Sequence, residues 1–210
     1  MKTTSSLLAF TFVLLSLSLA ARAQQPAAAP DYGTLDGSVY TNRFFGLTLN
    51  IPEGWLPQGE HAKQEIREKG RELIGPDDPE VERNARRVFN LLTVFRYPPG
   101  TSGPVNPTLL CSAERLPAAG VTDAVYMAGL KRLIQSTRAR VTVDRDVYAE
   151  TLGGQTFSVI VVTSEFRGAV THHKFYARIM KGYALTISLS YATPEPLPEQ
   201  TAALKSVRFR

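Results

Sequence analysis

The sequence of 210 residues is poor in the groups that enzymes most often use. It contains one cysteine, one tryptophan and three histidines. It also lacks Gly-x-Ser-x-Gly, a phosphate-binding glycine loop, His-Glu-x-x-His and Cys-x-x-Cys. These absences argue against the familiar hydrolases, nucleotide-dependent enzymes and redox proteins. No cofactor and no metal site is expected from the motifs.

The single cysteine, Cys111, excludes a disulfide within the chain. It lies in the apolar stretch Leu109-Leu-Cys-Ser-Ala, so we interpret it as a small core residue. Pairing between two chains stays open as an alternative in an oxidising compartment. A role as a nucleophile is disfavoured, because no histidine or other base follows at a recognisable spacing.

Long clusters of one charge are also missing. The formal net charge is +5, but lysines and arginines are scattered among acidic residues without a run of five or more. Removal of Lys2 and Arg22 with the segment described next lowers the charge to +3 (5 − 2). A nucleic-acid-binding surface should be clustered, so we expect no nucleic-acid partner.

One apolar run stands out, from Leu7 to Ala20. Lys2 precedes it, and Ala21-Arg-Ala23 ends in the small-x-small pattern of a signal-peptidase site. We therefore predict a signal peptide over residues 1–23. An uncleaved membrane anchor is the alternative, although the run is short of the roughly 20 residues that a spanning helix needs. No cysteine comes directly after the run, at the position where a bacterial lipoprotein carries its lipid, so we expect no lipoprotein.

Cleavage predicts a periplasmic or secreted protein without a transmembrane segment. Residues 24–36 are rich in Ala, Pro and Gly and predict a flexible leader. Residues 37–210 predict one domain, since 43% hydrophobic and 20% charged residues are ordinary globular composition.

Alternation of apolar and polar residues predicts the strands of this domain. The first runs from Phe45 to Ile51, and Pro52 ends it because proline has no N–H to donate. Trp55 is expected to pack beside it. Further strands are predicted at residues 91–97, 108–116, 138–149, 157–166, 170–181 and 183–191. Glycines between the later strands, such as Gly153-Gly154, predict tight hairpins.

Helical spacing predicts the remaining elements. Thr122 is the expected N-cap of a helix over residues 122–134. The buried stripe of that helix is predicted to be Tyr126, Leu130, Leu133 and Ile134. Gly129 lies in its middle, which is consistent with a close approach to the sheet. A charged helical pair over residues 59–88 is expected to cover the sheet, with a partner-binding face as the alternative. A last helix spans residues 199–206, and its tail is expected to return to the sheet.

Strands joined by two-residue turns are antiparallel. The predicted fold class is therefore α+β: one antiparallel sheet of about six to seven strands with helices packed on its faces.

The domain begins with the motif Tyr40-x-Asn42-x-x-Phe45-Gly46, followed by Ile51-Pro52-x-Gly54-Trp55. This beginning resembles that of the PsbP-like family. The later strands and the tail Ser206-Val-Arg-Phe209 also resemble that family. The resemblance spans about residues 37–210. It implies an α-β-α sandwich that binds a partner without catalysis, and it carries over no active site. The charged segment 59–88 is longer than we expect for the corresponding segment in the family.

His172, His173 and Tyr176 are the candidate binding residues. Imidazole is a common metal ligand, but neighbouring residues of a strand point to opposite faces. His172 is expected to share a face with Lys174 and Tyr176, so the two histidines cannot chelate one ion unless another strand adds a ligand such as Glu165. His61 is expected on the surface of the charged helix.

Asp144 and Asp146 are predicted to lie on one face of their strand, in a solvated row of salt bridges or, alternatively, around a cation. We expect an exported, non-catalytic binding or accessory protein with a protein partner in the cell envelope. A small-ligand or metal carrier is the alternative, followed by an enzyme of unfamiliar type.

Overall fold

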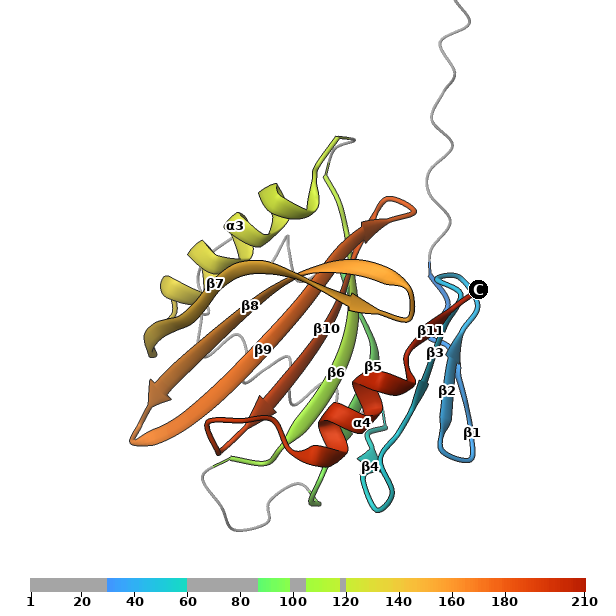
Figure 1. Ribbon diagram of the computed structural model, residues 1–210, viewed down its shortest axis with the longest axis horizontal. Coiled ribbons are helices and arrows are strands. Elements are labelled where there is room, and N and C mark those ends of the chain that lie inside the picture. Colours follow the sequence, from blue (N-terminus) through green and yellow to red (C-terminus); the bar gives the residue numbers. More distant parts are fainter. Residues whose placement is uncertain (1–29, 60–86, 99–104, 118–119) are drawn as a thin grey trace, which may run out of the picture.

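The computed structural model describes residues 30–59, 87–98, 105–117 and 120–210. These residues form two antiparallel sheets, of seven and four strands, and two α-helices (Figure 1). The α+β class with an antiparallel sheet and helices on its faces is thereby confirmed. Residues 1–23 and most of the charged segment 59–88, including His61, lie outside the described residues.

The main sheet has the strand order β4-β5-β6-β10-β9-β8-β7. Its strands are β4 (Leu56–Pro57), β5 (Val88–Phe95), β6 (Thr108–Arg115), β7 (Arg140–Leu152), β8 (Gln155–Phe166), β9 (Ala169–Met180) and β10 (Tyr183–Tyr191). The last four follow one another through tight hairpins, as predicted. Gly153 and Gly154 form the β7–β8 turn with φ of 55° and 79°, a conformation that favours glycine.

The smaller sheet has the order β1-β2-β3-β11. It comprises β1 (Thr34–Asp36), β2 (Val39–Asn42), β3 (Leu47–Asn50) and β11 (Arg208–Phe209). The predicted strand from Phe45 to Ile51 thus belongs to a sheet of its own, which corrects the expectation of a single sheet. Its buried face was predicted correctly, since Phe45, Leu47, Leu49 and Ile51 all lie in the core.

The described end of the predicted leader is part of this smaller sheet. β1 pairs with β2, and the side chain of Asn42 donates to the carbonyl oxygen of Asp31 over 2.7 Å. The side-chain oxygen of Asn42 accepts from the N–H of Phe45 over 3.0 Å. The buried Asn42 therefore ties residues 31–36 to the domain, so this part of the leader is not free.

Helix α3 (Asp123–Gln135) packs on one face of the main sheet. Thr122 caps it, accepting from the N–H of Val125 over 3.3 Å, as predicted. Met127 is the fully buried residue, whereas Leu133, expected in the stripe, is 43% exposed. A Cβ built on Gly129 meets no atom within 4 Å, so this glycine does not mark a close approach.

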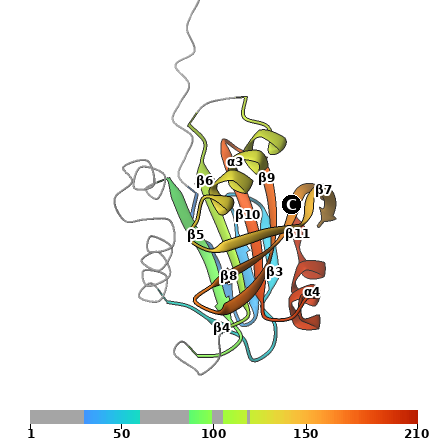
Figure 2. The ribbon, with the colours of Figure 1, turned by 90° about the vertical axis from the view of Figure 1, so that its left-hand side faces the viewer.

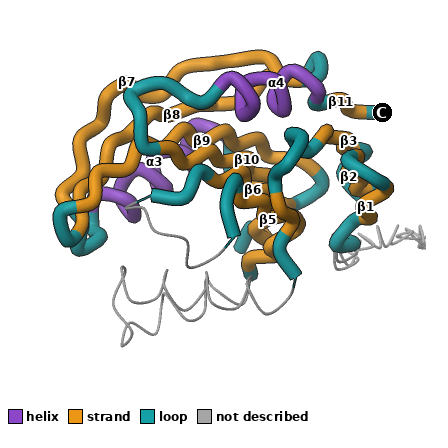
Figure 3. The backbone as a smooth tube through the Cα atoms, turned by 90° about the horizontal axis from the view of Figure 1, so that it is seen from below, coloured by secondary structure: helices purple, strands orange, loops and turns teal. Residues whose placement is uncertain are grey.

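Helix α4 (Pro198–Ser206) packs on the other face. Tyr176 belongs to the core beneath α4, and its neighbour Ala177 to the cluster beneath α3. The main sheet therefore lies between the two helices (Figure 3). The buried side chain of Gln200 anchors α4, donating to the carbonyl oxygens of Thr108 and Ser190 over 2.9 and 3.0 Å.

The hairpin of β7 and β8 curls toward the side on which α4 lies (Figure 2). Two irregularities in the β7–β8 register, between Val143 and Arg145 and between Arg145 and Tyr148, interrupt the alternation of β7. Among the described residues, no helix is long and apolar enough to cross a membrane.

Candidate functional site

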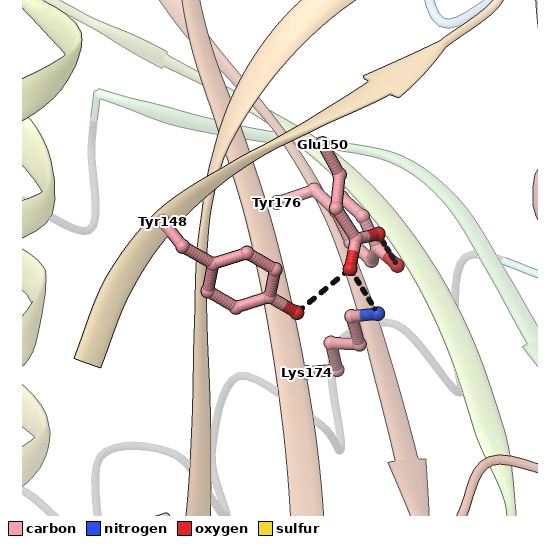
Figure 4. A network of polar contacts seen from close by, with 4 residues as sticks. All are labelled: Tyr148, Glu150, Lys174 and Tyr176. Atoms are coloured by element: carbon pink, nitrogen blue, oxygen red, sulfur yellow. Dashed lines mark hydrogen bonds and ion pairs between the residues drawn. The ribbon is translucent and has the colours of Figure 1, made fainter. Parts of the chain in front are cut away.

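Four polar side chains meet on the α4 face of the main sheet (Figure 4). The carboxylate of Glu150 accepts from the hydroxyl of Tyr148 over 2.7 Å and from the ammonium of Lys174 over 2.7 Å. Its second oxygen accepts from the hydroxyl of Tyr176 over 2.9 Å. We call Tyr148, Glu150, Lys174 and Tyr176 the Glu150 cluster.

The curl of β7 brings this cluster together. Glu150 pairs in register with Phe157 of β8, yet its carboxylate reaches past β8 to two side chains of β9. Lys174 and Tyr176 are two residues apart on β9 and so point to the same face. The cluster thereby ties the edge strand β7 to β9.

Electrostatics keep the cluster in one protonation state. Burial by itself would raise the pKa of Glu150, but the hydrogen bonds from Lys174, Tyr148 and Tyr176 outweigh it and lower that pKa below its usual value. Burial and the adjacent Glu150 raise the pKa of both tyrosines. Lys174 also lies 5.1 Å from the ring centroid of Tyr176. The cluster is thus an ionic centre in which Glu150 accepts three hydrogen bonds.

His172 lies on the same face, as the alternation predicted. Its Nδ1 is 2.8 Å from the hydroxyl of Thr163, which donates to the carboxylate of Asp144 over 2.6 Å. Because that hydroxyl has one proton, and donates it to Asp144, Nδ1 of His172 must carry the proton of the second bond. The ring stacks on Tyr191, with centroids 5.9 Å apart and planes 17° apart.

This tautomer leaves Nε2 of His172 without a hydrogen-bond partner among the described residues. The hydroxyl of Tyr191 likewise has no partner among them. Burial, with the nearby charges of Glu195 and Asp144, raises the pKa of Tyr191 to about 12, so the hydroxyl stays a donor. His172 and Tyr191 are therefore the two groups of this face that remain available to a ligand.

His173 lies on the α3 face and is already satisfied. Its Nε2 is 2.9 Å from the hydroxyl of Ser164 and its Nδ1 is 3.0 Å from the hydroxyl of Ser190. Burial, with the charge of His172, lowers its pKa to about 4. A neutral imidazole with both nitrogens engaged has no site for a ligand.

The described residues contain no group of three or more His, Cys, Asp or Glu side chains that could hold a metal ion. Glu165, the carboxylate considered as a third ligand, instead pairs with Arg140 at 3.4 Å. Cys111 is fully buried, and burial raises the pKa of its thiol to about 12, which fits a core residue.

The prediction that Asp144 and Asp146 share a face is wrong. Asp144 accepts from Thr163 on the α4 face, whereas Asp146 pairs with Lys131 of α3 at 2.8 Å. The register irregularities of β7 separate the two carboxylates, because they break the two-residue period. No shared cation site results.

Sequence reasoning identified His172 and Tyr176 but missed Tyr148, Glu150 and Thr163. One signal was present: Lys174 stands between His172 and Tyr176 on a strand face that is otherwise suited to the core. A buried charge requires a partner of opposite charge, but the sequence does not say which carboxylate provides it.

No protein-family model and no curated protein matches the chain. Several solved structures are similar to it, and three of them are described here. A crystallised protein of Bacteroides thetaiotaomicron shares 10% identity over 79% of this chain, with a TM-score of 0.44. This chain spans 45% of the length of that protein. LpqN of Mycobacterium tuberculosis, described as involved in cell envelope biogenesis, shares 16% identity over 75% of each chain, with a TM-score of 0.39.

The third is the cyanobacterial PsbP (CyanoP) of Synechocystis sp. PCC 6803. It shares 12% identity over 85% of this chain and 98% of its own length, with a TM-score of 0.44. A PsbP is thus among the structures similar to this chain, as the Tyr40–Trp55 motif implied, and the likeness concerns the fold alone.

Proposed function

We propose that this protein is a non-catalytic binding protein that acts in the periplasm or after secretion, as an accessory to another protein of the cell envelope. The observation that carries the proposal is that three reactive side chains of the described residues are already engaged or buried. Glu150 accepts three hydrogen bonds, His173 uses both ring nitrogens, and Cys111 is buried. Groups that are bonded to one another in this way are poorly placed to transfer protons to a substrate.

The contact of Asp144, Thr163 and His172 also differs from a nucleophilic triad. In a triad, the base accepts the proton of the hydroxyl, and the carboxylate orients the base. Here the hydroxyl of Thr163 donates to the carboxylate itself and accepts from His172. The arrangement fixes the imidazole and does not activate the hydroxyl, which favours a binding role over hydrolysis.

Native mass spectrometry of the untagged protein, isolated gently from the cell envelope, tests this proposal. A second polypeptide bound in a fixed ratio supports it. A protein that carries no polypeptide, even after chemical cross-linking in intact cells, contradicts it.

The carrier of a small ligand is a second candidate, favoured by the open Nε2 of His172 and the hydroxyl of Tyr191. A ligand that donates a hydrogen bond to the first and accepts from the second fits this pair. In the same spectrum, a small adduct that disappears in His172→Gln and persists in His173→Gln supports the carrier. An adduct that persists in both variants excludes this site.

A further inference from the structure

Five cationic side chains gather at one end of the molecule: Arg43, Arg178, Lys181, Arg208 and Arg210. We call them the basic end. They come from the turn between β2 and β3, the end of β9, the β9–β10 turn and the C-terminal strand. In Figure 1 the β9–β10 hairpin and the C-terminus lie together at the upper right. Residues that are far apart in the sequence therefore form one basic surface.

Direct contacts join these segments. The ammonium of Lys181 donates to the carbonyl oxygen of Phe44 and lies 5.4 Å from the centroid of its ring. The N–H of Arg210 donates to the carbonyl oxygen of Gly46 over 3.0 Å. Lys181 and Arg210 thus both contact the turn that carries Arg43.

The other two cations adjoin the β7–β8 hairpin at the same end. A Cβ on Gly153 would lie 3.0 Å from the Cα of Arg208, so the hairpin touches β11. The guanidinium of Arg178 donates to the carbonyl oxygen of Thr156, just beyond that hairpin, over 2.7 Å.

These cations lack the acidic partner that some other basic residues of the domain have. Lys131, Arg140 and Lys174 each form a salt bridge within the described residues. None of the five residues of the basic end does so there, and all but Arg178 are exposed. Two acids lie near these cations: Asp31 accepts from the N–H of Phe44 over 3.0 Å, and Asp123 accepts from the N–H of Ile179, next to Arg178, over 2.7 Å. They offset two of the five charges. This still leaves an excess of positive charge.

We propose that the basic end binds the surface of an anionic phospholipid membrane. The cations come from two turns and the ends of two strands, an arrangement that suits a surface of many phosphates. Tyr32, which is 55% exposed, adjoins Asp31 at this end, and aromatic rings favour the membrane–water interface.

Co-sedimentation with vesicles tests the proposal. The exported form of the protein is mixed with vesicles of phosphatidylglycerol and phosphatidylcholine in equal parts, and with vesicles of phosphatidylcholine alone. We expect binding to the first, weak binding to the second, and loss of binding in concentrated salt, because salt screens exposed charges. Absence of binding to the anionic vesicles at low salt overturns the proposal.

The variant Arg43→Gln/Arg210→Gln removes two cations whose side chains make no hydrogen bond to the described residues, so folding should be preserved. Each cation near an anionic surface strengthens binding about fivefold, so we expect a loss of roughly 30-fold for the pair. The control Arg132→Gln/Arg138→Gln changes the charge equally at the other end of α3 and β7 and should bind like the wild type.

Equal losses in both variants overturn the proposal, since net charge alone would then explain binding. Binding to soluble polyglutamate with none to anionic vesicles also overturns it, in favour of an acidic protein partner. The outcome does not depend on whether the proposed envelope partner is found, because the vesicle assay contains no second protein.

Discussion

Glu150→Gln removes the negative charge on which Tyr148, Lys174 and Tyr176 converge and leaves the shape of the side chain almost unchanged. The ammonium of Lys174, whose side chain is 18% exposed, then loses its charged partner. Hydrogen bonds to charged groups contribute about 1.5–3 kcal/mol each. The Glu150 side chain is 31% exposed and the amide keeps one acceptor, so solvent and the remaining bond reduce the loss. We expect unfolding to become easier by about 2 kcal/mol.

Urea unfolding followed by circular dichroism measures this loss. In a double-mutant cycle, Glu150→Gln with Lys174→Met should give a coupling energy of about 1 kcal/mol, because the two side chains share the strongest bond of the cluster. Glu165→Gln is the matched control. It breaks the exposed pair with Arg140 and should cost less than about 0.5 kcal/mol.

The stabilisation that the Glu150 carboxylate provides also depends on pH. The folded pKa of Glu150 is lowered, so its stabilisation is complete above the unfolded value of about 4.3 and is lost as pH falls toward the folded pKa. Wild type and Glu150→Gln should therefore converge in stability at acid pH. Equal stability of the two proteins at pH 7, or a coupling energy near zero, would refute the view that the cluster ties β7 to β9.

Three further predictions follow from single sites. Gly129→Ala should stabilise the protein by about 1 kcal/mol in thermal unfolding, because Gly129 is helical and a Cβ there meets no atom within 4 Å; destabilisation would mean that α3 packs differently. Cys111 should resist a thiol reagent in the native protein and react fully in urea, because its thiol is buried with a pKa raised to about 12. Rapid native labelling would contradict that burial. His173 has a folded pKa lowered to about 4, so its contribution to stability is present above the unfolded value of about 6.5 and is lost as pH falls between these values. His173→Gln should flatten the stability curve in that range, whereas an unchanged slope would place the titration elsewhere.

Local pattern determined much of the domain from the sequence alone. The alternation of β9 placed His172 and His173 on opposite faces, and Thr122 correctly marked the start of α3. Gly153-Gly154 marked a hairpin that the structure contains. These features were readable because backbone geometry within a few residues dictates side-chain direction, caps and tight turns.

Only the tertiary structure decided which strands pair and which side chains meet. β3 pairs with β11 at the far end of the chain, and the N–H of Asn50 donates to Ser206 across 156 positions. Because of the register irregularities in β7, Asp144 and Asp146 lie on opposite faces of the sheet. Because that strand curls, Glu150 contacts Lys174.

The basic end shows the same division. The composition reveals a modest excess of positive charge without a run of cations, which in the sequence alone argues against a binding surface. Folding brings Arg43, Lys181 and Arg210 to one turn, because the ammonium of Lys181 donates to the carbonyl oxygen of Phe44 and the N–H of Arg210 donates to that of Gly46. Periodicity depends on neighbouring residues, so it can be recognised in the sequence. A surface depends on segments far apart in the sequence that come together through burial and strand pairing, so it is known only from the tertiary structure.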